Sequence, residues 1–107
     1  MTKITDVTAA TFDTAVAARA GLVLIDLWSP GCVPCRALAP IVDDLAADFV
    51  GQVAVCKIDV DAEPSLSERL AVRGVPTLAL YRDGREIDRV LGIRTRSHLS
   101  QWIEEHL

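Results

Sequence analysis

Two cysteines three residues apart carry the most reactive side chains of this 107-residue sequence. They lie in the segment Cys32-Val33-Pro34-Cys35, just before a stretch whose apolar residues recur at helical spacing. One helical turn brings residues at this spacing near the Cα separation that a disulfide needs, so the bond can close without large movement. The pair therefore predicts thiol-disulfide exchange.

The two cysteines are predicted to have different roles. Cys32, at the N-terminus of the predicted helix, faces unpaired backbone N–H groups and the positive end of the helix dipole, which favour the thiolate. It is the predicted nucleophile. Cys35 lies one turn inside the helix and is the predicted resolving thiol, which attacks once a mixed disulfide has formed. Pro34 suits the first turn of a helix, where its missing N–H is not needed.

A zinc site is the alternative interpretation of the same pair, because two cysteines at this spacing form half of many such sites. A closed site needs two more ligands, and the candidates are Cys56, His98 and His106, which form no second closely spaced pair. We expect no metal and assign the two histidines no function. Cys56 lies in a predicted core strand, where we expect it to act as a small hydrophobic residue. A regulatory disulfide or glutathionylation site is the alternative for Cys56.

Asp26 is unusual because it interrupts the apolar run Leu22-Val23-Leu24-Ile25-Asp26-Leu27-Trp28. Burial disfavours the charged carboxylate and raises its pKa, which suits a group that accepts and returns a proton. We hypothesise that Asp26 serves Cys35 through water and that Lys57 moderates the pKa shift from a neighbouring strand. A purely structural buried ion pair is the alternative.

The elements that must position these residues alternate along the chain. Apolar runs predict strands, and apolar residues at helical spacing predict helices. The predicted strands cover 3–6, 22–28, 53–58, 77–81 and 86–91, and the predicted helices cover 8–19, 34–49, 64–70 and a C-terminal segment that includes Leu99, Trp102, Ile103 and His106. Pro40 should kink the second helix. This order predicts an α/β fold whose mixed sheet has helices on both faces. The cysteines follow the central strand, at the strand end where such sheets carry their chemistry.

Composition excludes several classes of function. Half of the residues are apolar and 24% are charged, so we expect one folded domain over 1–107. The net charge of −4 has the wrong sign for nucleic acid or an anionic lipid surface. The longest apolar run is too short to span a membrane, and the N-terminus does not resemble a secretory signal, so we expect a cytoplasmic protein. No long apolar helix face is left over, which favours a monomer.

The sequence resembles the thioredoxin family over essentially its whole length. A lone Cys-x-x-Cys would be weak evidence, but here many family positions recur in order and at the family's spacing. These positions are Asp26, Trp28, Cys32, Pro34, Cys35, Pro40, Lys57, Arg73-Gly74-Val75-Pro76-Thr77, Gly84 and Gly92.

This resemblance implies the thioredoxin fold, a central mixed five-stranded sheet flanked by four helices in the order βαβαβαββα. It also implies a thiol-disulfide oxidoreductase that reduces disulfides in protein substrates, an electron-transport role in cell redox homeostasis. The carrier would hold no cofactor beyond its Cys32–Cys35 redox-active disulfide. An NADPH-dependent flavoprotein, a donor like thioredoxin reductase, would re-reduce it.

The resemblance further implies a substrate-binding surface around the disulfide. Pro76 matches the family's cis-proline, whereas X-Pro bonds in general are cis in only about 5–6% of cases. Backbone before this proline would pair with extended substrate, and Trp28 matches a tryptophan packed near the disulfide, with an ordinary core aromatic as the alternative. An apolar docking surface would come from Val33, Pro34, Val75, Gly92 and Ile93.

Two positions depart from the family pattern. Gly31 stands where tryptophan is usual, which removes a large aromatic from the docking surface. Val33 stands where glycine is usual, and the residues between the cysteines tune the reduction potential of such motifs. We expect only a modest shift from about −270 mV. These departures leave open a dedicated or more oxidising disulfide donor or isomerase. A binding module with incidental redox activity is the alternative from another class.

Overall fold

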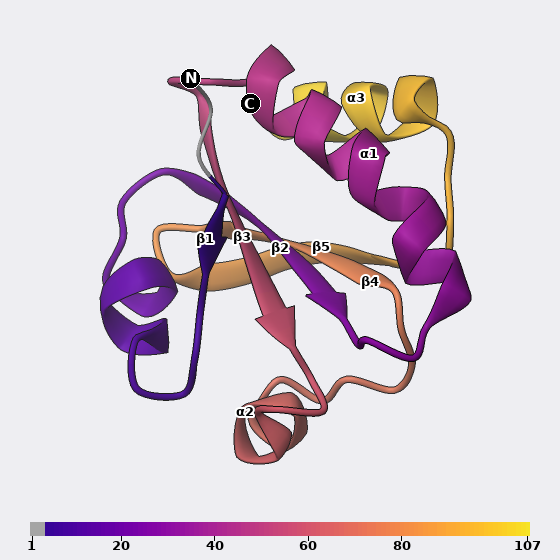
Figure 1. The fold of residues 1–107 in the computed structure, drawn as a ribbon. Helices are drawn as coiled ribbons and strands as arrows, with labels where there is room; N and C mark the ends of the chain where they lie inside the picture. Colours follow the sequence, from indigo (N-terminus) through magenta and orange to yellow (C-terminus); the bar gives the residue numbers. More distant parts are fainter. Residues whose placement is uncertain (1–3) are drawn as a thin grey trace.

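The computed structural model describes residues 4–107, and over these residues a mixed five-stranded sheet has the order β1-β3-β2-β4-β5 (Figure 1). The strands are β1 (Thr5–Asp6), β2 (Leu22–Trp28), β3 (Val53–Asp59), β4 (Thr77–Arg82) and β5 (Arg85–Leu91). The helical segments are η1 (Asp13–Ala17), α1 (Val33–Asp48), α2 (Pro64–Arg69) and α3 (Arg96–Glu104). The predicted order of elements and the α/β class are confirmed.

Strand β2 is the centre of the sheet. It pairs in parallel with β3 and antiparallel with β4, and six of its seven residues are buried. Apolar residues at six of the seven positions, all but Asp26, suit a strand that is covered on both faces. Because β2 is paired on both sides, the position of the segment that follows Trp28 is fixed at the carboxyl end of the strand.

Helices cover both faces of the sheet, with α1 and α3 on one face and η1 and α2 on the other (Figure 1). Alternate residues of β2 point to opposite faces. Leu22 and Leu24 join the core under α1 and α3, whereas Val23, Ile25 and Leu27 join the core under η1 and α2. Asp26 has the parity of Leu24 and therefore lies on the α1 face.

The predicted helix over 8–19 is wrong in extent and type, since the segment that forms is a short π-helix over Asp13–Ala17. The backbone N–H of Thr8 donates to the Thr11 hydroxyl, a local bond that competes with regular helix. Hydrogen bonds of four-residue spacing, such as Phe12 to Thr8, then give way to a five-residue bond from the Ala18 N–H to the Asp13 carbonyl. Apolar spacing at Phe12 and Val16 indicated a helix but not this irregular geometry.

Other boundaries differ by one or two residues. Helix α1 runs from Val33 through Pro40 to Asp48, where 34–49 was expected. The kink at Pro40 remains a prediction. The C-terminal helix ends at Glu104, so His106 lies beyond it. Of the predicted first strand, Lys3 lies outside the described residues.

Within residues 4–107, no helix is both long and apolar enough to cross a membrane.

Candidate active site

Cys32 and Cys35 are joined by a disulfide, and their Cα atoms lie 5.2 Å apart. Cys32 is the residue immediately before α1, and its sulfur accepts a hydrogen bond of 3.1 Å from the Cys35 backbone N–H. Cys32 is partly exposed, whereas Cys35 is 5% exposed. Solvent and partners therefore reach Cys32 first, and a helix N–H group is already aimed at its sulfur, an arrangement that favours the thiolate once the disulfide is reduced.

Three chain segments meet at the end of the sheet that carries the disulfide. Leu27 of β2 pairs with Thr77 of β4, so the residue before β4, Pro76, lies beside the end of β2. The Val75–Pro76 peptide bond is cis, as the family resemblance implied. The Gly92 N–H donates to the Pro76 carbonyl at 2.8 Å, which ties the segment after β5 to the same place.

Asp26 lies beneath the disulfide and is only 3% exposed. Burial raises the pKa of its carboxyl from 3.8 to about 6, while the positive charge of Lys57 opposes that rise and Asp43 adds to it. Asp26 and Lys57 are register partners on the parallel strands β2 and β3. The carboxyl can therefore exchange a proton near neutral pH.

A cavity of 150 Å³ connects Asp26 to the resolving cysteine. Liquid water occupies about 30 Å³ per molecule, so this volume has room for several waters. Water in the cavity can bridge the carboxyl and the thiol by hydrogen bonds. The cavity is lined by Asp26, Trp28, Ser29, Pro30, Cys35, Arg36, Ala39 and Lys57.

The residues expected to bind substrate lie around the disulfide. Val33 is 68% exposed and Ile93 is 44% exposed, so both apolar side chains are accessible to a partner. Gly31 and Pro34 are exposed, Val75 and Gly92 are half-buried, and Pro76 is buried. Trp28 is half-buried and lines the cavity with Cys35, and its buried indole N–H has no hydrogen-bond partner among residues 4–107.

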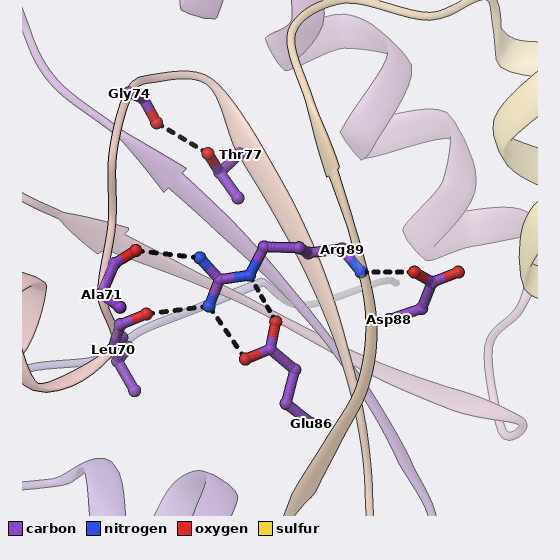
Figure 2. Close-up of polar contacts among 7 residues, drawn as sticks. All are labelled: Leu70, Ala71, Gly74, Thr77, Glu86, Asp88 and Arg89. Carbon is purple, nitrogen blue, oxygen red and sulfur yellow. Dashed lines mark hydrogen bonds and ion pairs between the residues drawn. The ribbon is translucent and has the colours of Figure 1, made fainter.

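Arg89 of β5 anchors the loop that leads to Pro76 (Figure 2). Its guanidinium donates to the carbonyls of Leu70 and Ala71 at 2.8 and 3.1 Å, where α2 has just ended. The same guanidinium bonds both carboxylate oxygens of Glu86. Further along, the Thr77 hydroxyl donates to the Gly74 carbonyl at 2.6 Å. The loop is thus fixed at both ends, with Val75 and Pro76 between them.

Sequence reasoning missed two arginines at the site. Arg36 follows Cys35 in α1 and donates to the Pro30 carbonyl at 3.0 Å. Arg94 follows Ile93 and donates to the carbonyls of Leu91 and Ile93 at 3.1 and 3.0 Å. Each arginine directly follows a predicted site residue, and that position is the signal in the sequence. The sequence does not indicate the direction in which either guanidinium points.

The third cysteine is not part of this site. Cys56 is 4% exposed and belongs to the core under η1 and α2, on the opposite face of the sheet from Asp26. Burial raises the pKa of its thiol to about 12. Among residues 4–107, no three His, Cys, Asp or Glu side chains are placed to share a metal ion.

Comparison with known proteins identifies close relatives. The thioredoxin family profile matches residues 3–105. Proteins named thioredoxin from Staphylococcus aureus strains Mu50 and MW2 are each 38% identical over 104 residues, which is 97% of this chain and 98% of each relative.

Proposed function

This chain belongs to the thioredoxin family, and we propose that it is a general dithiol carrier in which Cys32 attacks, Cys35 resolves and Asp26 moves the proton. It is a thiol-disulfide oxidoreductase and a protein-disulfide reductase. The observation that carries the assignment of roles is the Cys32–Cys35 disulfide at the start of α1, directly over the cavity that holds Asp26.

The reaction begins with the reduced protein. The Cys32 thiolate attacks one sulfur of a substrate disulfide, which breaks the substrate S–S bond, forms a mixed disulfide and releases the first substrate thiolate. The Cys35 thiolate then attacks the Cys32 sulfur, which forms the Cys32–Cys35 bond and releases the second substrate thiolate. Two electrons pass from the dithiol to the substrate, and each released thiolate takes up one proton.

Asp26 accepts the proton of Cys35 through water in the cavity and returns it to solvent or to the leaving thiolate. Its pKa of about 6 supports this role, because the ionised carboxylate is available around neutral pH yet close to its protonation point. Lys57 keeps the pKa from rising further. Asp26 therefore acts on Cys35, which is too buried to lose its proton directly to bulk solvent.

Substrate docks on the surface formed by Trp28, Gly31, Val33, Pro34, Val75, Pro76, Gly92 and Ile93. The backbone of Val75 pairs with an extended segment of the substrate, in the manner of an added strand. Exposed Val33 and Ile93 border that segment and pack against it. A surface of this size suits brief encounters with many protein disulfides.

The electron donor, the compartment and the oligomeric state are part of the same proposal. Electrons for re-reduction come from an NADPH-dependent flavoprotein of the thioredoxin reductase type, and the protein serves electron transport in the cytoplasm as a monomer of one domain, 1–107. A radius of gyration of 12.5 Å supports the single domain, since about 13 Å is expected for a chain of this length. A buried unpaired thiol at Cys56 supports a reducing compartment.

Redox titration tests the proposed carrier function. The Cys56→Ala protein is equilibrated with defined thiol-disulfide buffers while Trp28 fluorescence is followed. A midpoint close to about −270 mV supports a reducing carrier. A midpoint above about −200 mV overturns it and indicates an oxidising donor or isomerase. Trapping of a substrate on Cys32 in Cys35→Ser, but not in Cys32→Ser, tests the two thiol roles.

A further inference from the structure

Each of the three segments that meet at the disulfide end of the sheet carries one exposed arginine. Arg36 follows Cys35 in α1, Arg73 lies in the loop before Pro76, and Arg94 lies in the segment after Gly92. The chain as a whole carries a net charge of −4, so three arginines on these segments depart from the average composition of the chain. A local charge of this kind attracts partners of the complementary sign.

Arg94 lies on the docking surface and not beside it. Its Nη1 atom donates to the carbonyls of Leu91 and Ile93, which flank Gly92. The same atom is 3.5 Å from the place where a Cβ on Gly92 would stand. The guanidinium therefore covers the backbone at Gly92, and its Nε and Nη2 make no hydrogen bond with residues 4–107.

Arg36 is held in a similar way on the other side of the disulfide. Its Nη2 donates to the Pro30 carbonyl, and its side chain lines the cavity with Cys35. An arginine already fixed by a backbone carbonyl loses less conformational entropy when it binds a carboxylate than a mobile one does. Arg36 and Arg94 are thus two prearranged cationic groups that flank the reactive sulfurs.

Arg73 has a more balanced environment. It borders a groove that is also lined by Asp61 and Glu68, whose charges offset its own. Of the residues that the structure describes, no acid lines the groove that Arg94 borders with Ile41, Ile93, Thr95 and His98. The cavity that Arg36 lines holds one acid and one further base, Asp26 and Lys57, so its lining is not acidic overall. Arg36 and Arg94 are therefore the two arginines whose charge the groove lining does not offset.

We propose that this surface selects protein disulfides whose flanking residues are acidic, with Arg36 and Arg94 pairing with carboxylates on either side of the attacked sulfur. This proposal rests on the docking surface of the proposed function and names the substrate class it prefers. Because the pairs form at the rim of a small interface, they act on KM and on the rate of encounter and leave kcat alone. Salt screens them.

Matched peptides test the preference. Three peptides share one disulfide ring and differ only in flanking residues, which are Glu, Gln or Lys, and kcat/KM is measured for each at low and high ionic strength. We expect the Glu peptide to exceed the Gln peptide by on the order of fivefold at low salt, the combined size of two exposed ion pairs. We expect the Lys peptide to be the poorest substrate. High salt should bring the three values together.

Two double variants distinguish the effect of the arginines beside the disulfide from the effect of the net charge of the protein. In Arg36→Gln/Arg94→Gln the Glu-to-Gln ratio should fall close to one through a change in KM. In Arg82→Gln/Arg85→Gln, the same charge change is made at the exposed β4–β5 turn, and the ratio should stay as in the wild type. Each ratio compares two peptides on one enzyme, so a change of redox potential cancels.

The outcomes distinguish this proposal from the proposed function. Equal kcat/KM for all three peptides in the wild type, with all three reduced, overturns the acidic preference and leaves the reductase intact. An equal loss of the ratio in both double variants also overturns it, because overall charge would then explain the preference. Failure to reduce any peptide overturns the proposed function itself.

Discussion

Asp26 and Lys57 lie opposite each other on the parallel strands β2 and β3, below the disulfide and within the wall of one cavity. No direct ion pair joins them among residues 4–107. Burial therefore has the largest effect on the pKa of the Asp26 carboxyl. The pKa rises to about 6 although the positive charge of Lys57 lowers it. An acid in this state weakens the fold when ionised and can move protons when the pH is near neutral.

Replacing Asp26 by Asn should stabilise the protein at high pH. Because the folded-state pKa is raised from 3.8 to about 6, the folded protein binds this proton more tightly than the unfolded chain does. The free energy of unfolding therefore falls as the pH rises through this window, by about 3 kcal/mol in total. Urea unfolding of the oxidised protein should show that advantage for Asp26→Asn at about pH 8 and lose it at about pH 4.

An equal difference between Asp26→Asn and the wild type at both pH values would contradict the raised pKa. Asp61→Asn, at an exposed carboxyl, is the control for the loss of one acidic side chain.

Resolution of the mixed disulfide should slow when Asp26 is removed. Without a base in the cavity, the Cys35 thiol must lose its proton to a distant acceptor. In Asp26→Ala we expect single-turnover release of substrate near neutral pH to slow by on the order of a hundredfold, the low end of general acid-base catalysis. Lys57→Met should move the inflection of the pH profile upward, because Lys57 lowers the pKa of Asp26. Unchanged single-turnover rates in Asp26→Ala would reject the role.

Cys56 should resist alkylation in the folded, reduced protein. Its thiol is 4% exposed and its pKa is raised to about 12, so both access and thiolate content are low. We expect iodoacetamide to modify Cys56 at least about a thousandfold more slowly than an ordinary exposed cysteine. Peptide mapping by mass spectrometry measures this, with denaturant-unfolded protein as the control. Rapid labelling of the native protein would instead favour a regulatory thiol.

Two glycines should respond differently to alanine. At Gly84 the φ angle is +81°, and an added Cβ would collide with the Ala17 backbone. Gly84→Ala should therefore lower the free energy of unfolding by about 3 kcal/mol or more. At Gly31 an added Cβ would lie more than 4 Å from every residue of 4–107 other than its chain neighbours, and Gly31→Ala should be close to neutral. Thermal unfolding of both variants checks this, and a comparable loss in both would contradict the geometry.

Arg89 should stabilise the loop before Pro76. Arg89→Met removes the donors to Leu70 and Ala71, whose carbonyls would then lack their charged partner. We expect a loss of about 1–3 kcal/mol in the free energy of unfolding and faster amide exchange at Val72. Arg85→Met, in the same strand, is the matched control. Equal exchange at Val72 in the two variants would show that Arg89 does not hold the loop.

The sequence predicts most of this architecture because the strongest patterns in it are long. The apolar run of β2, interrupted only by Asp26, predicts a buried strand, and the helical spacing in α1 predicts a helix. The Cys-x-x-Cys between them locates the site. The first helix was predicted too long, since local bonds at Thr8 and Thr11 are not visible in apolar spacing. The placement of the Arg94 guanidinium could not be predicted either. Its partners are backbone carbonyls, whose directions are set only when the turn after β5 has formed.

The position of Cys56 on the far face of the sheet has a consequence for how the chain oxidises. Three thiols allow three pairings, Cys32–Cys35, Cys32–Cys56 and Cys35–Cys56. The folded sheet stands between Cys56 and the other two, so the last two pairings are open only to an unfolded chain. A chain with a Cys32–Cys56 or Cys35–Cys56 disulfide must break that disulfide before it can form this sheet. In the folded chain, Cys32–Cys35 is therefore the one intramolecular disulfide that we expect to form.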